Sequence, residues 1–273
     1  MRLTRRSFLA GLAGAGVAVV APTAWYGAVY EPNDIEIVHK SMPIRKLPAR
    51  LDGLTAVQIS DLHLDTADEL HEGMVKKITA LKPDAVFFTG DLINDQTASR
   101  AAVDIFQGIK APLGAWSVFG NSDHSAQAEE TLPVELKRAG VRFLTNENAQ
   151  LEAGLWLVGV DDPSNYMVEM KQALDGVPDG QPRILLGHSP DVVDQMDGAR
   201  FDLILAGHTH GGQINLPLVN GAWLLNGPSR RYVEGMFDVG GSPMYVNRGI
   251  GTAKVPVRLG SRPEITYFTF HAA

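Results

Sequence analysis

Seven side chains that can bind a metal ion stand at the ends of short apolar runs in this chain. Each run, such as "LILA" before Gly207, ends in a small residue that is followed by a carboxylate, an imidazole or an amide. The chain has only eight histidines in 273 residues, and four of them belong to this set. The set consists of Asp61, His63, Asp91, Asn121, His188, His208 and His210.

These donor types indicate a borderline divalent metal such as Mn²⁺, Fe or Zn²⁺. The chain has no cysteine, so thiolate ligands are excluded, and calcium prefers oxygen ligands alone. Seven donors exceed what one tetrahedral site uses, so the set predicts two metal ions that share a carboxylate, about 3.5–4 Å apart. Residues two apart on an extended strand point the same way, so both members of D-x-H and of H-x-H can face one metal cluster.

The apolar runs themselves predict buried β-strands. Amphipathic helices are expected between several of them, at Asp68–Leu81, Ala98–Ile109 and Glu129–Ala139, and this alternation indicates an α/β fold. Ligands of open α/β sheets bind beyond the carboxyl ends of the strands, where the polar clusters lie. The runs are 54–63, 84–91, 114–123, 155–162, 183–189 and 201–210, with further strands expected at 33–44, 242–251 and 263–270.

Composition indicates an ordinary globular protein. Hydrophobic residues make up 45% of the chain and charged residues 20%, and the net charge is −7. Such a charge provides no basic surface for nucleic acid, so we expect no nucleic-acid partner. We find no internal repeat or linker after residue 50, and residues 31–273 are therefore expected to form one domain.

The first 30 residues have the layout of an export signal or a membrane anchor. Three arginines precede an apolar run, Phe8–Val20, and no acidic residue occurs among them. The pair Arg5 and Arg6 in "TRRSFL" resembles the twin-arginine signal, which implies the twin-arginine export machinery as a partner and a periplasmic or extracytoplasmic location. Cleavage after Ala24 and retention of residues 8–30 as an inner-membrane anchor both remain open.

In their order along the chain, the motifs D-x-H, G-D, G-N, G-H and G-H-x-H resemble those of the calcineurin-like metallophosphoesterase superfamily. "SDLH", "GHTHGGQI" and "NRGIGT…PVR…RPEIT" are closest to its exported, lipid-associated phosphodiesterase branch. The resemblance implies a β-sandwich flanked by helices over residues 35–270. It also implies that one metal is held by Asp61, His63, Asp91 and His210, and that Asp91 bridges to a second metal held by Asn121, His188 and His208.

Two such cations would lower the pKa of a bridging water, so that hydroxide is available near neutral pH, and would neutralise the phosphate oxygens. We therefore interpret the chain as a dinuclear phosphodiesterase or pyrophosphatase acting on a lipid or cell-envelope phosphate ester, with lasting or transient membrane association. One alternative is a phosphomonoesterase such as a nucleotidase. The other is a non-catalytic metal-binding protein on the same fold.

The chain departs from the family pattern at one position. The family motif G-N-H-[DE] has a histidine that can protonate the leaving group, whereas this chain reads "GNSDH", with Ser122 in that place. His124, two residues later, is the candidate general acid, a role worth about 10²–10⁴ in rate. The other interpretations are a leaving group that needs little help and a weak activity.

Several polar residues outside the motifs have less specific interpretations. Asn94 and Asp95 follow the G-D motif and either support the metal ligands or cap the next helix. Arg248 is interpreted as a salt-bridge residue. Three further histidines are interpreted as surface or packing residues, namely His39, His71 and His271.

Overall fold

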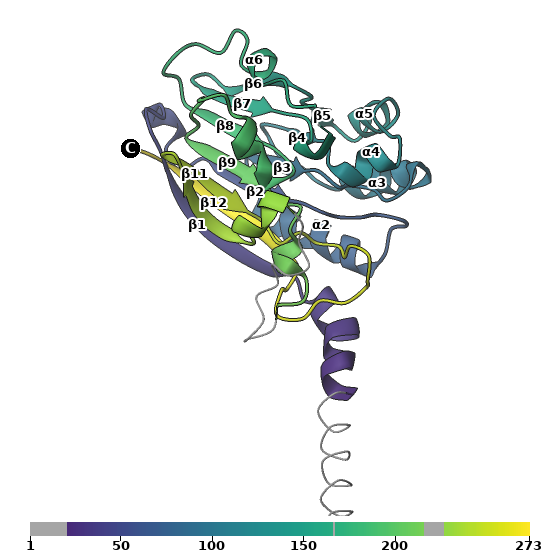
Figure 1. Ribbon diagram of the computed structural model, residues 1–273. Helices are drawn as coiled ribbons and strands as arrows, with labels where there is room; N and C mark the ends of the chain where they lie inside the picture. Colours follow the sequence, from purple (N-terminus) through teal and green to yellow (C-terminus); the bar gives the residue numbers. More distant parts are fainter. Residues whose placement is uncertain (1–20, 166, 216–226) are drawn as a thin grey trace, which may run out of the picture.

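The computed structural model describes residues 21–165, 167–215 and 227–273. Its first part is helical, since residues 21–25 form an α-helix that continues as the π-helix η1 (Tyr26–Tyr30), and this helix projects from the rest of the protein (Figure 1). The predicted signal arginines and the run Phe8–Val20 lie outside the described residues. Within the described ranges, no helix is both long and apolar enough to cross a membrane.

Two six-stranded sheets form the centre of the protein. The first sheet contains, in spatial order, β1 (Glu36–Ile44), β12 (Glu264–Ala272), β2 (Thr55–Ile59), β3 (Ala85–Thr89), β4 (Ala115–Val118) and β5 (Val141–Phe143). The second contains β10 (Gly235–Val239), β11 (Ser242–Val246), β9 (Leu203–Ala206), β8 (Arg183–Leu186), β7 (Leu155–Gly159) and β6 (Glu147–Glu152).

The sheets pack face to face because the inner faces of their strands are apolar, and the central strands are apolar on their outer faces as well. In β3, Ala85 and Phe87 belong to the core between the sheets, together with Leu205 of β9, whereas Val86 and Phe88 belong to the core beneath the helices. This alternation follows from the two-residue period of a strand. It explains why these strands appear in the sequence as continuous apolar runs rather than as alternating ones.

Helices cover the outer face of each sheet and complete four layers. The first sheet is covered by α2 (Glu69–Leu81), α3 (Ser99–Phe106) and α5 (Leu132–Lys137), which bury Met74, Phe106 and Leu136 against it. The second sheet is covered by the short α6 (Met170–Ala173) and the 3₁₀-helix η6 (Pro190–Gln195). The predicted fold class, a β-sandwich flanked by helices, is confirmed.

The predicted helices are present but shorter than expected at two places. The helix α2 begins after Asp68, whose carboxylate accepts a hydrogen bond from the backbone N–H of His71 and so caps it. The segment predicted as Ala98–Ile109 is helical over Ser99–Phe106, and Glu129–Ala139 is helical over Leu132–Lys137. Further short elements are η2 (Glu31–Asn33), η3 (Ala49–Leu51), η4 (Gln96–Ala98), α4 (Asn121–Ser125), η5 (Pro163–Asn165), η7 (His210–Gly212) and η9 (Gly227–Arg231).

The topology brings the ends of six strands to one edge of the sandwich. In the first sheet β2, β3 and β4 are adjacent and parallel, and in the second sheet β7, β8 and β9 are adjacent and parallel. The Gln58 amide of β2 donates to the carbonyl of Ala206 in β9 at 2.9 Å, which joins the two sheets near these ends. The loops that follow the strands therefore face a common space.

Candidate metal centre

All seven predicted donors lie shortly after the strand ends at this edge, and contacts connect them into one cluster. Asp61 and His63 follow β2, Asp91 follows β3, and Asn121 is the first residue of α4 after β4. From the second sheet come His188, after β8, and the pair His208 and His210, after β9. Residues from five strand ends therefore meet in space, as the sequence predicts.

One part of the cluster is formed by Asp61, His63 and His210. The Nε2 atoms of the two histidines lie 3.1 Å apart, and Nε2 of His210 lies 3.4 Å from Oδ1 of Asp61. Asp91 is next to this group, since its Oδ2 lies 3.4 Å from Nε2 of His63. Two imidazole nitrogens and a carboxylate that converge in this way can donate to one cation.

The second part of the cluster is formed by Asp91, Asn121, His188 and His208. Nε2 of His188 lies 3.4 Å from Oδ1 of Asp91 and 3.2 Å from Oδ1 of Asn121. Nδ1 of His208 lies 3.2 Å from the same Nε2 atom. Asp91 thus contacts both parts through its two oxygens, the position that a bridging carboxylate requires.

The backbone at the cluster is held in conformations that most residues avoid. Five of the seven predicted donors have positive φ angles, between 49° and 70°, namely Asp61, His63, Asp91, His208 and His210. A non-glycine residue in this region costs of the order of 1 kcal/mol or more and persists only where its surroundings enforce it. Such concentration of strain is typical of a functional site.

Glycines next to the donors allow the loops to approach one another. A Cβ atom on Gly120 would overlap the carboxylate of Asp91, and one on Gly207 would overlap the side chains of Ser60 and Asp61. The backbone N–H of His208, directly after Gly207, donates to the Asp61 carboxylate at 3.0 Å. The glycines of the G-N and G-H-x-H motifs are therefore explained by close packing between neighbouring loops.

Further hydrogen bonds orient the predicted donors. Nδ1 of His188 lies 2.8 Å from the carbonyl oxygen of Thr89, which can only accept, so Nδ1 carries the hydrogen and Nε2 faces the cluster. Asn94 contacts His63 twice, with Oδ1 2.8 Å from its Nδ1 and with Nδ2 donating to its carbonyl at 2.9 Å. Of the two interpretations of Asn94, the structure shows support of His63, whereas Asp95 caps η4.

Arg258 is a supporting residue to which the sequence pattern assigns no role. Its side chain is fully buried, and its guanidinium donates to the carbonyls of Gly251, Ser261 and Arg248. One of its terminal nitrogens lies 3.4 Å from Nδ1 of His210. Burial lowers the pKa of Arg258 to about 10, so the side chain remains charged at neutral pH. It appears in the sequence only as part of "PVR".

The electrostatics of the cluster suit a cation. Burial lowers the pKa of His210, and the neighbouring charge of His63 lowers it further, so His210 is held neutral. Burial likewise lowers the pKa of His208. Burial would raise the pKa of Asp91, but His188 outweighs this effect and keeps the carboxylate ionised. The carboxylate of Asp91 raises the pKa of His188 despite its burial, so a metal ion would displace a proton from this imidazole. Neutral His208 and His210 and an ionised Asp91 are already in the forms that bind divalent metals.

His124 lies close to the cluster in sequence but is bound to other partners. Its Nε2 is 2.6 Å from Oδ1 of Asp161 and its Nδ1 is 2.7 Å from Oε1 of Glu129. The hydrogen bond to Asp161 outweighs burial and raises the pKa of His124 to about 9. Ser122, in the place of the family histidine, donates to the Asp91 carboxylate through its N–H and its hydroxyl. The acid role of His124 stays a prediction, and this geometry favours a structural one.

The remaining polar residues have partners that explain them. Arg248 forms ion pairs with Glu36, Glu234 and Glu264, which agrees with its interpretation as a salt-bridge residue. His71 is buried and hydrogen-bonds through Nδ1 to Asp68 at 2.6 Å.

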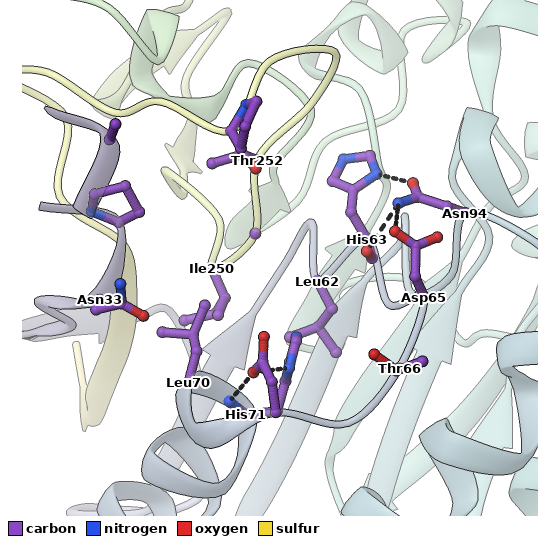
Figure 2. A pocket seen from close by; sticks show the side chains of 15 residues that line it. Asn33, Leu62, His63, Asp65, Thr66, Leu70, His71, Asn94, Ile250 and Thr252 are labelled. Atoms are coloured by element: carbon purple, nitrogen blue, oxygen red, sulfur yellow. Dashed lines mark hydrogen bonds and ion pairs between the residues drawn. The ribbon is translucent and has the colours of Figure 1, made fainter. Parts of the chain in front are cut away.

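A cavity of about 340 Å³ begins beside the cluster at His63 and Asn94 and extends to the N-terminal segment at Ala28 and Pro32. Figure 2 shows Leu62, Leu70 and Ile250 in its middle. A volume of this size can hold part of an organic substrate next to the predicted metal ligands. Neither sequence motif nor periodicity reveals this cavity.

Comparison with known proteins finds a matching family model and several similar proteins. The family model described as calcineurin-like phosphoesterase matches residues 54–212. The chain is 32% identical to the metallophosphoesterase YkuE of Bacillus subtilis, over 98% of each chain. It is 30% identical to phosphodiesterase YaeI of Escherichia coli, over 97% of this chain and 98% of that protein. It is 28% identical to the UDP-2,3-diacylglucosamine pyrophosphatase LpxG of Chlamydia muridarum, over 90% and 93% of the two chains.

Proposed function

Because the chain belongs to the calcineurin-like phosphoesterase family and is a metal-dependent phosphoester hydrolase, we propose that it uses two metal ions to hydrolyse a phosphodiester or pyrophosphate bond. The observation that carries this proposal is the contact of Asp91 with both parts of the donor cluster. A carboxylate between two groups of imidazoles can bind two metal ions at once, as a dinuclear site requires. A site for one ion does not require a carboxylate in this position.

Each ion would have its own set of ligands. Asp61, His63 and His210 would hold one ion, and Asn121, His188 and His208 the other, with Asp91 shared between them. When bound, such ions supply Lewis acidity toward the phosphate oxygens and a nucleophile derived from water. Asn94, Thr89 and Arg258 hold the imidazoles in place, and Ser122 orients the shared Asp91 carboxylate.

We further propose that the substrate is a lipid or cell-envelope phosphate ester. Two relatives are named as a phosphodiesterase and as a pyrophosphatase of a diacylated sugar nucleotide, which supports this class. The N-terminal helix is consistent with an enzyme that acts at a membrane surface, because it exposes four large apolar side chains to solvent, those of Trp25, Tyr26, Val29 and Tyr30. Together with the twin-arginine pattern, these residues favour an enzyme at the outer face of the inner membrane.

The activity is tested by comparing two chromogenic esters. Full-length protein, purified in detergent and reconstituted with Mn²⁺, should hydrolyse bis-p-nitrophenyl phosphate faster than p-nitrophenyl phosphate. The His208→Ala variant should lose the activity, because it lacks a predicted ligand of the second ion. A preference for the monoester would support a phosphomonoesterase instead, and two bound metals without turnover of either ester would support a non-catalytic protein.

The location is tested by fractionation. Replacing both Arg5 and Arg6 by lysine should retain the protein in the cytoplasm, because the twin-arginine machinery requires the arginine pair. Export of this variant at the level of the unaltered protein would contradict the proposed route.

A further inference from the structure

The cavity beside the donor cluster has two chemically different walls. One wall is apolar and includes Leu62, Leu70, Ile250 and Pro256. The other is polar and carries the carboxylates of Asp68 and Asp65, and Figure 2 shows Asp65 beside His63 and Asn94. Since His63 and Asn94 form the end of the cavity, a phosphate held at the donor cluster would direct one of its ester substituents into this space.

The charged groups of the cavity have one sign. Among the described residues that line it there is no lysine or arginine, whereas two are aspartates. Asp65 is exposed, its carboxylate accepts a hydrogen bond from the neutral amide of Asn94 at 3.3 Å, and it forms no ion pair with a described residue. Such a wall repels a second phosphate or a carboxylate and attracts an ammonium group.

A buried histidine holds one of the two carboxylates in place. His71 lines the cavity and is 5% exposed, and its Nδ1 lies 2.6 Å from the Asp68 carboxylate, which only accepts. Its Nδ1 therefore donates to Asp68, and the backbone N–H of His71 donates to the same oxygen at 3.1 Å. Asp65 and Asp68 are both exposed at the cavity, so their carboxylates can accept hydrogen bonds from an ammonium or hydroxyl group of a ligand.

We propose that this cavity binds one alcohol portion of a phosphodiester and selects an amino alcohol over an anionic group. The apolar wall packs against the carbon atoms of this portion, and Asp65 and Asp68 face its ammonium group. This inference rests on the proposed phosphodiesterase function and narrows it. It favours a diester over a pyrophosphate, whose second phosphate would have to enter an acidic cavity.

The proposal is tested with three p-nitrophenyl phosphodiesters of similar size that share one leaving group. Their second alcohols are choline, the uncharged 3,3-dimethylbutanol and the anionic 4-hydroxybutanoate. With metal-loaded full-length protein, we expect kcat/KM for the choline ester to exceed that of the uncharged ester roughly tenfold, as a partly solvated charge pair allows, with the anionic ester slowest. Equal values for the three esters would overturn the proposed selectivity while leaving the phosphodiesterase function in place.

Two variants locate the effect in the cavity. Asp65→Asn should reduce the ratio of choline to uncharged ester toward one, and Asp179→Asn, an exposed aspartate that does not line the cavity, should keep the ratio of the unaltered protein. Thr66→Lys places a cation on the cavity wall and should shift the preference toward the anionic ester. An unchanged order of preference in both cavity variants would contradict the assignment.

The outcomes also separate this inference from the function on which it rests. Absence of metal-dependent turnover with all three esters would overturn both. Glycerophosphoethanolamine and dioleoylphosphatidylethanolamine in mixed micelles, each compared with its uncharged-headgroup counterpart, distinguish a soluble source of the amino alcohol from a lipid. A preference for the ethanolamine member of either pair would support the inference and identify the source, and equal rates within both pairs would count against it.

Discussion

The ion-paired histidine at position 124 gives a stability prediction that can be worked out from its contacts. Its two ring nitrogens contact Asp161 and Glu129, and its side chain is 7% exposed. The pKa of His124 rises from an ordinary 6.5 to about 9, with the hydrogen bond to Asp161 as the largest cause. Since one unit of pKa difference corresponds to about 1.4 kcal/mol, the folded state gains at most about 3.5 kcal/mol.

The expected contribution of His124 to the free energy of unfolding is smaller than this limit, because Glu129 is partly solvated. The Glu129 side chain is 42% exposed, so water screens its share of the interaction. We therefore expect His124→Gln to lower the free energy of unfolding by about 2 kcal/mol at pH 6. Because the pKa is raised in the folded state, this stabilisation is fully present below pH 6.5 and is lost as the pH rises through 9.

Urea unfolding of metal-free protein followed by circular dichroism, at several pH values between 6 and 10, measures this difference. The two proteins should converge in stability at pH 10. A difference that stays constant over this range would refute the ion-pair account of His124.

The same variant tests the general-acid role. If His124 protonates the leaving group, His124→Gln should slow the hydrolysis of alkyl diesters far more than that of p-nitrophenyl diesters. Because both ring nitrogens of His124 contact carboxylates, we expect the rate of hydrolysis to fall by the same factor for the two kinds of ester.

Three further substitutions test the supports of the donor cluster. Asn94→Ala should weaken metal binding about tenfold in a dye-competition titration, since it removes both contacts that orient His63. An unchanged affinity would contradict this role. Gly120→Ala should abolish metal-dependent hydrolysis because its Cβ would overlap Asp91, whereas Gly73→Ala, with open space around it, should remain active. Arg258→Met should lower the free energy of unfolding in urea by roughly 3 kcal/mol, because three carbonyls lose a buried donor. A change below about 0.5 kcal/mol would show that the packing tolerates its loss.

The sequence predicts the strands that carry the donors because these strands are buried on both faces. The runs ending at Asp91 and His188 are almost continuously apolar for this reason, whereas the run ending at Asp61 includes the buried Gln58. Parallel pairing then brings the strand ends together. The start of α2 is also predicted, because Asp68 is a favourable capping residue. Other strands, such as β10, alternate between half-buried and exposed positions and provide a weaker signal.

The supports of the cluster are harder to predict because they depend on contacts between distant segments. Arg258 is an isolated cation in the sequence, and nothing near it indicates that it is buried beside His210, 48 residues earlier. The cavity is formed by the N-terminal segment, the start of α2 and residues 250–256, which meet only in the folded chain. The position of Ser122 is visible in the motif, but its two hydrogen bonds to Asp91 are not.

The central claim, a two-metal site with Asp91 between the ions, is tested most directly by counting bound metals. Elemental analysis of full-length protein matured with ample Mn²⁺, Fe and Zn²⁺ should find two metal ions per chain. Asn121→Ala, which removes a donor from the second part alone, should retain about one, and Asp91→Ala should retain fewer than one. A single metal in the unaltered protein, or two metals in Asp91→Ala, would contradict the claim.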